Sequence, residues 1–291
     1  MLRQYIKTHK EPFDSYMMEL IEKELIPKTL KQSMLYSLSV GGKRLRPIIL
    51  FAVLETLGLD ATKGYSTAAA LEMIHTYSLI HDDLPAMDDD DLRRGKPTNH
   101  RVFGEAIAIL AGDALLTHAF RLICQDEELN EKQKLRLIDC LSEAAGPTGM
   151  VAGQVLDMEA EQKELTLSQL KEVHLHKTGR LIEFSVIAAG IIANASEPLI
   201  QDLKQFSRHI GLAFQIKDDI LDVEGERDLI GKDVGSDLEN GKNTYVSLAT
   251  LAGAKQLLNE EIETALSYLN KISFDTTLLA SITCYIKDRQ S

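Results

Sequence analysis

The chain has 291 residues, of which 44% are hydrophobic, and it carries a net charge of −12. A chain of this length can bury a large core, whereas its negative charge argues against nucleic acid as a partner, because a phosphate backbone needs a basic surface. The three cysteines are odd in number and lack metal-binding spacing. This pattern favours reduced thiols that pack in the core. No apolar signal segment opens the chain, and the uncharged run 186–193 is too short to cross a bilayer. We therefore expect a cytoplasmic protein with no membrane insertion.

Apolar residues recur at i, i+3, i+4 and i+7 through most of the chain, a spacing typical of amphipathic helices. Glycine and proline separate roughly ten helical segments. No linker rich in Pro, Gly or Ser divides the chain, and no short-period repeat is evident. The sequence therefore predicts an all-α fold with a single domain over residues 1–291.

The first segment with distinctive chemistry reads Gly-Gly-Lys-Arg-Leu-Arg-Pro, at residues 41–47. It opens an apolar helix predicted over 48–57, so that Lys43 and Arg46 lie near the helix N-terminus. Such an end, with cationic side chains beside it, favours anion binding. The GxxxxGK[ST] spacing of a P-loop is missing, so ATP is not implied. An ordinary basic loop remains an equal alternative.

Six of the ten residues from 82 to 91 are aspartates, and they follow the apolar segment 73–80. Carboxylates at the end of a buried helix repel one another unless a cation neutralises them. Oxygen ligands without His or Cys favour Mg²⁺, Ca²⁺ or Mn²⁺. Pro85 forces a turn that can return Asp88 to the same cation. The basic turn 92–98 follows at once, as a metal-plus-diphosphate site requires; a charge-balanced surface loop is the alternative.

The helix that precedes these aspartates carries three further candidates. His75 and Ser78 share one helical stripe with Asp82, although a single helical histidine is more often a hydrogen-bonded core residue than a ligand. Tyr77 lies five residues before Asp82, about 7.5 Å deeper along the helix. Its ring could form the floor of a hydrophobic pocket, and ordinary core packing is the simpler interpretation.

Lys177-Thr178-Gly179 interrupts a long apolar helix predicted over 175–193. A buried lysine needs an anionic partner, and glycine within a helix costs about 1 kcal/mol relative to alanine. We expect a local kink that points polar atoms into a cavity. The alternative is a packing glycine beside a lysine whose ammonium reaches solvent.

A second aspartate cluster, Asp218-Asp219-Ile-Leu-Asp222, follows the apolar segment 210–216. Its first and last aspartates are spaced i, i+4 and share a helix face with Gln215. Alone, this motif is more typical of a solvated acidic helix end. The polar stretch 224–243 comes next, and a loop of that length is often a functional lid. It does not fit the EF-hand pattern.

In order and spacing, these motifs resemble those of the short-chain trans-isoprenyl diphosphate synthases. The resemblance is carried by GGKRLRP, LIHDDLPAMDDDDLRRGKPTNH, GQVLDM (153–158), HKTGRL, FQIKDDILD and GKDVGSD, and more loosely by residues 285–289. It implies an all-α bundle around a central cavity and a homodimer. It also implies a prenyltransferase that condenses isopentenyl diphosphate head-to-tail (1′-4) with dimethylallyl or geranyl diphosphate through an allylic carbocation.

The resemblance also assigns roles to individual residues. Three Mg²⁺ ions, with Mn²⁺ as a substitute, would be held by Asp82, Asp83, Asp88, Asp218, Asp219 and Asp222. The allylic diphosphate would be bound by Arg93, Lys177, Gln215, Lys232 and Lys242. Isopentenyl diphosphate would be bound by Lys43, Arg46, His75 and Arg94. The catalytic residues would be Lys177, Thr178 and Gln215, of which Thr178 and Gln215 would direct partial negative charge at the carbocation. Tyr77 and Ser78, aromatic then small, resemble the chain-length residues of the fifteen-carbon bacterial type.

Four alternatives remain open. A geranylgeranyl diphosphate synthase would have the same site and a deeper pocket. A terpene cyclase needs no second substrate site, and the two basic elements at 43–46 and 93–94 argue against it. A non-catalytic partner subunit of a heteromeric prenyltransferase would be expected to lose one aspartate motif, whereas both are intact. A helical scaffold that binds divalent cations is the simplest alternative.

Overall fold

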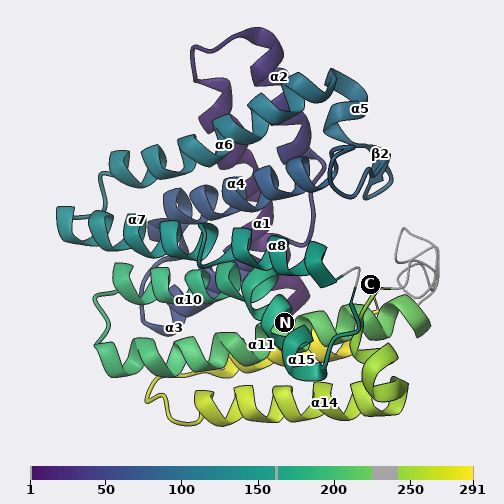
Figure 1. Cartoon of the computed structure of the whole chain (residues 1–291). Coiled ribbons are helices and arrows are strands. Elements are labelled where there is room, and N and C mark those ends of the chain that lie inside the picture. Colours follow the sequence, from purple (N-terminus) through teal and green to yellow (C-terminus); the bar gives the residue numbers. More distant parts are fainter. Residues whose placement is uncertain (1, 161–162, 225–241, 291) are drawn as a thin grey trace. The chain divides into compact units, whose positions relative to one another are not determined.

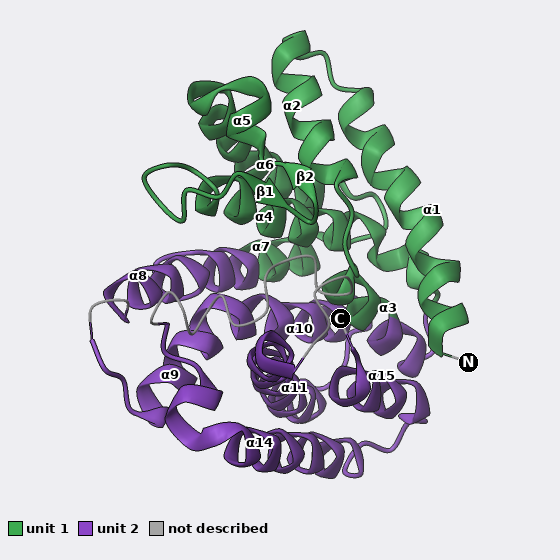
Figure 2. Cartoon of the chain, turned by 90° about the vertical axis from the view of Figure 1, so that its right-hand side faces the viewer, with its two compact units in different colours: residues 1–51, 60–138 green, residues 52–59, 139–291 purple. Residues whose placement is uncertain are grey.

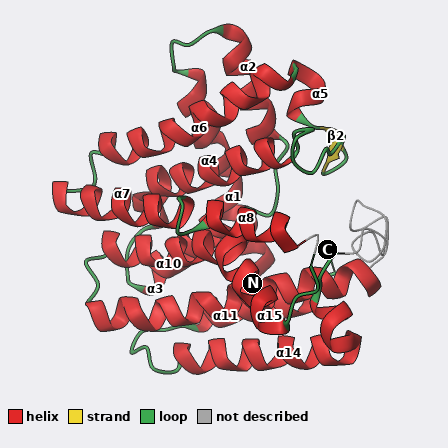
Figure 3. Ribbon diagram, in the orientation of Figure 1, coloured by secondary structure: helices red, strands yellow, loops and turns green. Residues whose placement is uncertain are grey.

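The computed structural model describes residues 2–160, 163–224 and 242–290, and these residues are helical almost throughout (Figures 1 and 3). The first half contains α1 (Leu2–Glu22), α2 (Lys28–Ser39), α3 (Leu45–Thr56), a 3₁₀ turn (Ala61–Gly64), α4 (Tyr65–Asp82), α5 (Asn99–Phe103), α6 (Glu105–Gln125) and α7 (Glu131–Ala145). The second half contains α8 (Met150–Ala160), α9 (Leu167–His174), a π-helical turn (Leu175–Gly179), α10 (Arg180–Ile192), α11 (Glu197–Glu224), α14 (Tyr245–Leu269) and α15 (Thr277–Asp288). The predicted all-α fold is confirmed.

One short ribbon interrupts the helices. Strands β1 (Leu92–Arg93) and β2 (Lys96–Pro97) pair antiparallel, with Leu92 opposite Pro97. This ribbon occupies the predicted basic turn, so it fixes the directions of the side chains that follow the first aspartate cluster.

The chain divides into two compact units, which Figure 2 shows in green and purple. Unit 1 comprises residues 1–51 and 60–138, and unit 2 comprises residues 52–59 and 139–291. The first aspartate cluster and the basic segments at 41–47 and 92–98 belong to unit 1. Lys177, Gln215 and the second aspartate cluster belong to unit 2.

In unit 1, α4 is the central helix, and it packs against α6 and α2. Its residues from Thr67 to Ile74 are all buried, and small side chains at 68–70 let neighbouring helices approach closely. A helix buried on all sides has an apolar surface all round, which explains why the sequence from 67 to 80 is apolar at most positions. The polar end of α4 therefore emerges directly from the core.

Within the described residues, α6 is the one helix whose length and apolar composition would let it cross a membrane. Core helices of soluble proteins meet the same two criteria. In the structure α6 packs against α2, α4 and α5.

In unit 2, α11 packs along α14 and α10. Residues 181–186 of α10 are all buried, including the carboxylate-bearing Glu183. The interruption predicted at Lys177–Gly179 is a π-helical turn between α9 and α10. Such wide turns inside helices often occur at functional sites. Capping boxes at Thr166 and Thr244 begin α9 and α14.

Candidate active site

The first aspartate cluster begins where α4 ends. Leu84 and Asp83 donate backbone hydrogen bonds to the carbonyls of His81 and Leu79, which completes the last turn. The chain then reverses at Pro85, and the Asp88 N–H donates to the Asp82 carbonyl at 2.9 Å. The backbones of Asp82 and Asp88 are therefore held side by side, with the turn at Pro85 between them.

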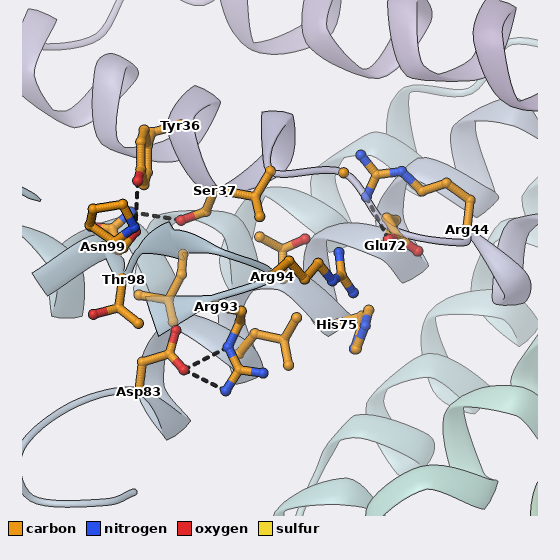
Figure 4. Close-up of a pocket in the computed structure, with 16 residues that line it drawn as sticks. Tyr36, Ser37, Arg44, Glu72, His75, Asp83, Arg93, Arg94, Thr98 and Asn99 are labelled. Atoms are coloured by element: carbon orange, nitrogen blue, oxygen red, sulfur yellow. Dashed lines mark hydrogen bonds and ion pairs between the residues drawn. The ribbon is translucent and has the colours of Figure 1, made fainter. Parts of the chain in front are cut away.

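Asp83 is buried and forms an ion pair with Arg93 of β1 (Figure 4). Nε of Arg93 donates to Oδ1 of Asp83 at 2.6 Å, and the guanidinium also lies 3.5 Å from Asp90. Burial raises the pKa of Asp83, and the hydrogen bond from Arg93 opposes this shift. The predicted metal ligand and the predicted phosphate-binding arginine therefore orient each other.

A basic pocket lies beside this ion pair. Gly41, His75, Arg93 and Arg94 line it, and Figure 4 shows Arg94 and His75 directed toward the same region. The Arg94 guanidinium lies against the backbone of Gly42, where an added Cβ would lie 2.7 Å from Cζ of the arginine. A larger residue at 42 would therefore displace this guanidinium.

The surroundings of His75 in this pocket favour its neutral form. Burial, followed by the charges of Arg46 and Arg94, lowers its pKa well below the ordinary value. Three guanidinium groups and two carboxylates, those of Glu72 and Asp83, line the pocket, which leaves one net positive charge and suits an anion. Lys43 is exposed at the edge of the same segment, and the Ser78 hydroxyl donates to the His75 carbonyl at 2.9 Å.

Arg44, to which the sequence assigned no role, anchors this segment from within. It is 5% exposed, and its guanidinium donates to Asp14, Glu72 and the Leu38 carbonyl, each at 2.7 Å. Its backbone has a φ of 49°, which is uncommon for a residue with a side chain. Both acids lie about 30 residues away in sequence, so no local pattern could have identified this network.

A second pocket lies in unit 2. Its lining includes Lys177, Thr178, Gln215, Asp219 and Lys242, which are predicted site residues. Nζ of Lys177 lies 2.6 Å from Oδ2 of Asp157. Asp157 is the fifth residue of the GQVLDM motif, and no sequence pattern pairs it with Lys177. It supplies the anionic partner that a half-buried lysine needs.

Each carboxylate of the second aspartate cluster has a defined setting on α11. Asp218 accepts a hydrogen bond from Arg289 at 2.6 Å. Asp219 accepts from the backbone N–H of Tyr245 at 2.7 Å and so holds the start of α14. Asp222 is 2% exposed. The C-terminal segment, which resembles the family only loosely, is therefore attached to the motif through Arg289.

The donor chemistry fits a hard divalent cation, because both clusters offer carboxylate oxygens alone. Within the described ranges, however, no three His, Cys, Asp or Glu side chains gather closely enough to hold a metal ion. Arg93 and Arg289 bond to Oδ1 of Asp83 and of Asp218, respectively. Each carboxylate also has a second oxygen that can bind a cation.

Two predicted features can be placed only in part. Lys232 and most of the predicted lid, residues 225–241, lie outside the described residues. Lys242, at the end of that stretch, is exposed and lines the pocket of unit 2.

Gly153 of α8 lies directly against the backbone of the π-helical turn at Lys177. A Cβ at this position would overlap the backbone nitrogen of Lys177 and lie 2.5 Å from its Cα. We expect Gly153→Ala to destabilise the protein by about 1–3 kcal/mol, because neither backbone can yield without separating α8 from the π-helical turn. Urea unfolding measures this loss.

Gly179→Ala is the matched control for that substitution. Gly179 ends the same π-helical turn, but its nearest neighbour, the His174 carbonyl oxygen, would lie at an ordinary 3.5 Å from an added Cβ. Equal losses of stability in both variants would contradict the assignment of Gly153 as the contact glycine.

Comparison with known proteins identifies the family of this chain. Residues 27–273 match the family model described as Polyprenyl synthetase, so the chain belongs to the polyprenyl synthetase family. It is 52% identical over 283 residues to a farnesyl diphosphate synthase of Geobacillus stearothermophilus, covering 97% of this chain and 95% of the relative. It is also 52% identical over 280 residues to a farnesyl diphosphate synthase of Bacillus subtilis, covering 96% and 95%.

A solved structure described as a putative farnesyl-diphosphate synthase from Marinomonas is similar along its whole length. It has a TM-score of 0.83 and 37% identity, and the match covers 99% of both chains. The all-α architecture is thus shared with a solved member of this group.

Proposed function

We propose that the protein is a farnesyl diphosphate synthase, which condenses isopentenyl diphosphate with dimethylallyl and geranyl diphosphates. The observation that carries this proposal is the 52% identity, over nearly the whole chain, to two farnesyl diphosphate synthases. The site supports it chemically, because a basic pocket with His75 and Arg94 lies next to the Asp83–Arg93 pair. A metal-binding scaffold would need no such pocket.

The six aspartates of the two motifs would bind the cations and, through them, the allylic diphosphate. Bound Mg²⁺ supplies positive charge that stabilises the diphosphate as it leaves. Arg93, Lys177, Gln215 and Lys232 would contact the same diphosphate, with Lys242 assisting. These side chains add positive charge and hydrogen bonds where negative charge grows, and so favour ionisation of the C–O bond.

Lys43, Arg46, His75 and Arg94 would hold the diphosphate of isopentenyl diphosphate. The lowered pKa of His75 favours the neutral imidazole, which can donate one hydrogen bond to a diphosphate oxygen. The two substrates would then be held in position for attack of the double bond on the allylic cation.

Thr178, Gln215 and nearby backbone carbonyls would direct partial negative charge at the carbocation. The departed diphosphate would accept the proton that is lost after the new bond forms, which explains why no side chain needs to act as a general base. An apolar surrounding would exclude water, which would otherwise quench the cation.

The proposal includes the organisation of the protein. The whole chain, residues 1–291, would work as one prenyltransferase domain, and the family resemblance favours a homodimer. We also propose a cytoplasmic location for the enzyme.

The direct test incubates purified protein with Mg²⁺, isopentenyl diphosphate and geranyl diphosphate, followed by chromatography of the products. We expect the fifteen-carbon diphosphate, and loss of activity when EDTA is added. Absence of any prenyl product would refute the function, and full activity in EDTA would refute the metal requirement.

Tyr77 is proposed to limit the product length, with Ser78 beside it. Tyr77 is 7% exposed on α4, so its ring occupies space inside unit 1 that a small side chain would leave empty. We expect Tyr77→Ala to shift the product from fifteen toward twenty carbons, as separated by chromatography.

The control for Tyr77→Ala is Tyr16→Ala, which removes a half-buried tyrosine whose ring contacts Tyr65 at a centroid distance of 5.4 Å. This variant should keep the fifteen-carbon product. A twenty-carbon main product from the wild-type protein would instead favour the geranylgeranyl alternative.

A further inference from the structure

His81, to which no role has been assigned so far, is fixed between two helices of unit 1. It follows Tyr77 by four residues on α4, so the two side chains lie on one face of the helix. Their ring centroids are 5.6 Å apart with an interplanar angle of 81°, an edge-to-face contact. Aromatic rings favour this arrangement.

The other side of the His81 ring is held by α6. Its Nε2 lies 3.1 Å from the backbone carbonyl oxygen of Ile109, which can only accept, so Nε2 carries the proton and donates. The ring also lies against Gly112, where an added Cβ would overlap Nε2 and lie 2.6 Å from Cδ2. A glycine at 112 is therefore required for the ring to occupy this place.

These contacts leave the ring little freedom. Its side chain is 28% exposed, and rotation about either side-chain bond would break the hydrogen bond to Ile109 or the contact with Tyr77. We propose that His81 is a positioning residue for product length, which holds the Tyr77 ring in place from the backbone of α6. This inference rests on the proposed function and on the role of Tyr77 in it.

The proposed role of His81 can be distinguished by experiment from a purely structural role. If His81 only ties α4 to α6, its removal lowers stability and leaves the product unchanged. If it holds the Tyr77 ring, its removal frees that ring to move aside and admit a longer chain. The ratio of twenty-carbon to fifteen-carbon product distinguishes the two, because a ratio of products does not depend on the amount of folded enzyme.

The experiment compares His81→Ala and Gly112→Ala with the wild-type protein, using isopentenyl and geranyl diphosphates. Both variants should raise the twenty-carbon to fifteen-carbon ratio by roughly fivefold, the change expected from losing one aromatic contact. Gly112→Ala tests the same point without removing the histidine, since alanine favours the helix and acts only by displacing the ring. Adding His81→Ala to Tyr77→Ala should produce no further change, because the two residues act through one ring.

His118→Ala is the matched control. His118 lies on α6 near Glu24 and Arg121, and its removal should leave the product ratio unchanged. An unchanged ratio in His81→Ala, in a wild-type background that makes the fifteen-carbon product, would overturn this inference alone. An unchanged ratio in Tyr77→Ala would overturn it together with the role of Tyr77, and a wild-type protein that makes no prenyl product would overturn the proposed function itself.

Discussion

Asp82→Asn is expected to lower kcat/KM for geranyl diphosphate by a factor of about 10²–10³, the loss typical when one preorganised electrostatic group is removed from a catalytic site. The turn at Pro85 holds Asp82 beside Asp88 through the 2.9 Å backbone hydrogen bond. Asparagine keeps the shape of the side chain and removes its charge, so the cation would lose an anionic ligand. Steady-state kinetics over a range of Mg²⁺ concentrations measures both the rate and the metal requirement.

Asp89→Asn is the control for this prediction. Asp89 belongs to the same run of aspartates but is exposed and has a φ of 51°, a conformation that asparagine tolerates well. The Asp89→Asn variant should retain wild-type kinetics. If both variants lose activity equally, the effect comes from the overall charge of the cluster, and Asp82 is not a specific ligand.

Those parts of the site whose residues lie close together in the sequence could be predicted. Carboxylates that end a buried helix, a proline that turns the chain, and a basic turn directly afterwards can all be recognised within 20 residues. The structure places Asp83, Arg93, Arg94 and His75 around one pocket. The interruption at Lys177 was also predictable, because lysine and glycine inside an apolar helix conflict with helix burial.

The partners of these groups were not predictable, because they come from distant segments. Asp157 pairs with Lys177, and Arg289 pairs with Asp218 across 71 residues of sequence. A side-chain pair of this kind depends on how helices pack, which single-sequence periodicity does not define. The same limit applies to His81, whose neighbour Gly112 lies on another helix.

Arg44 is the clearest example of a residue whose partners the sequence does not reveal. Arg44→Met is expected to destabilise the protein by about 3–5 kcal/mol. The side chain is 3% exposed, and its partner Glu72 is 4% exposed. Methionine fills most of the volume but leaves the carboxylate of Glu72 buried without its cation, and an uncompensated buried charge is costly. Urea-induced unfolding, followed by circular dichroism, measures the change in the free energy of unfolding.

Arg101→Met is the matched control, because Arg101 forms an exposed ion pair with Asp91 at 3.0 Å. Exposed pairs contribute about 0–1 kcal/mol, so this variant should unfold close to the wild-type midpoint. If the cost at Arg44 comes from the unpaired acid, changing Glu72 to Gln in the Arg44→Met protein should recover part of the lost stability. A double variant less stable than Arg44→Met would show that the arginine acts through its bonds to Asp14 and the Leu38 carbonyl instead.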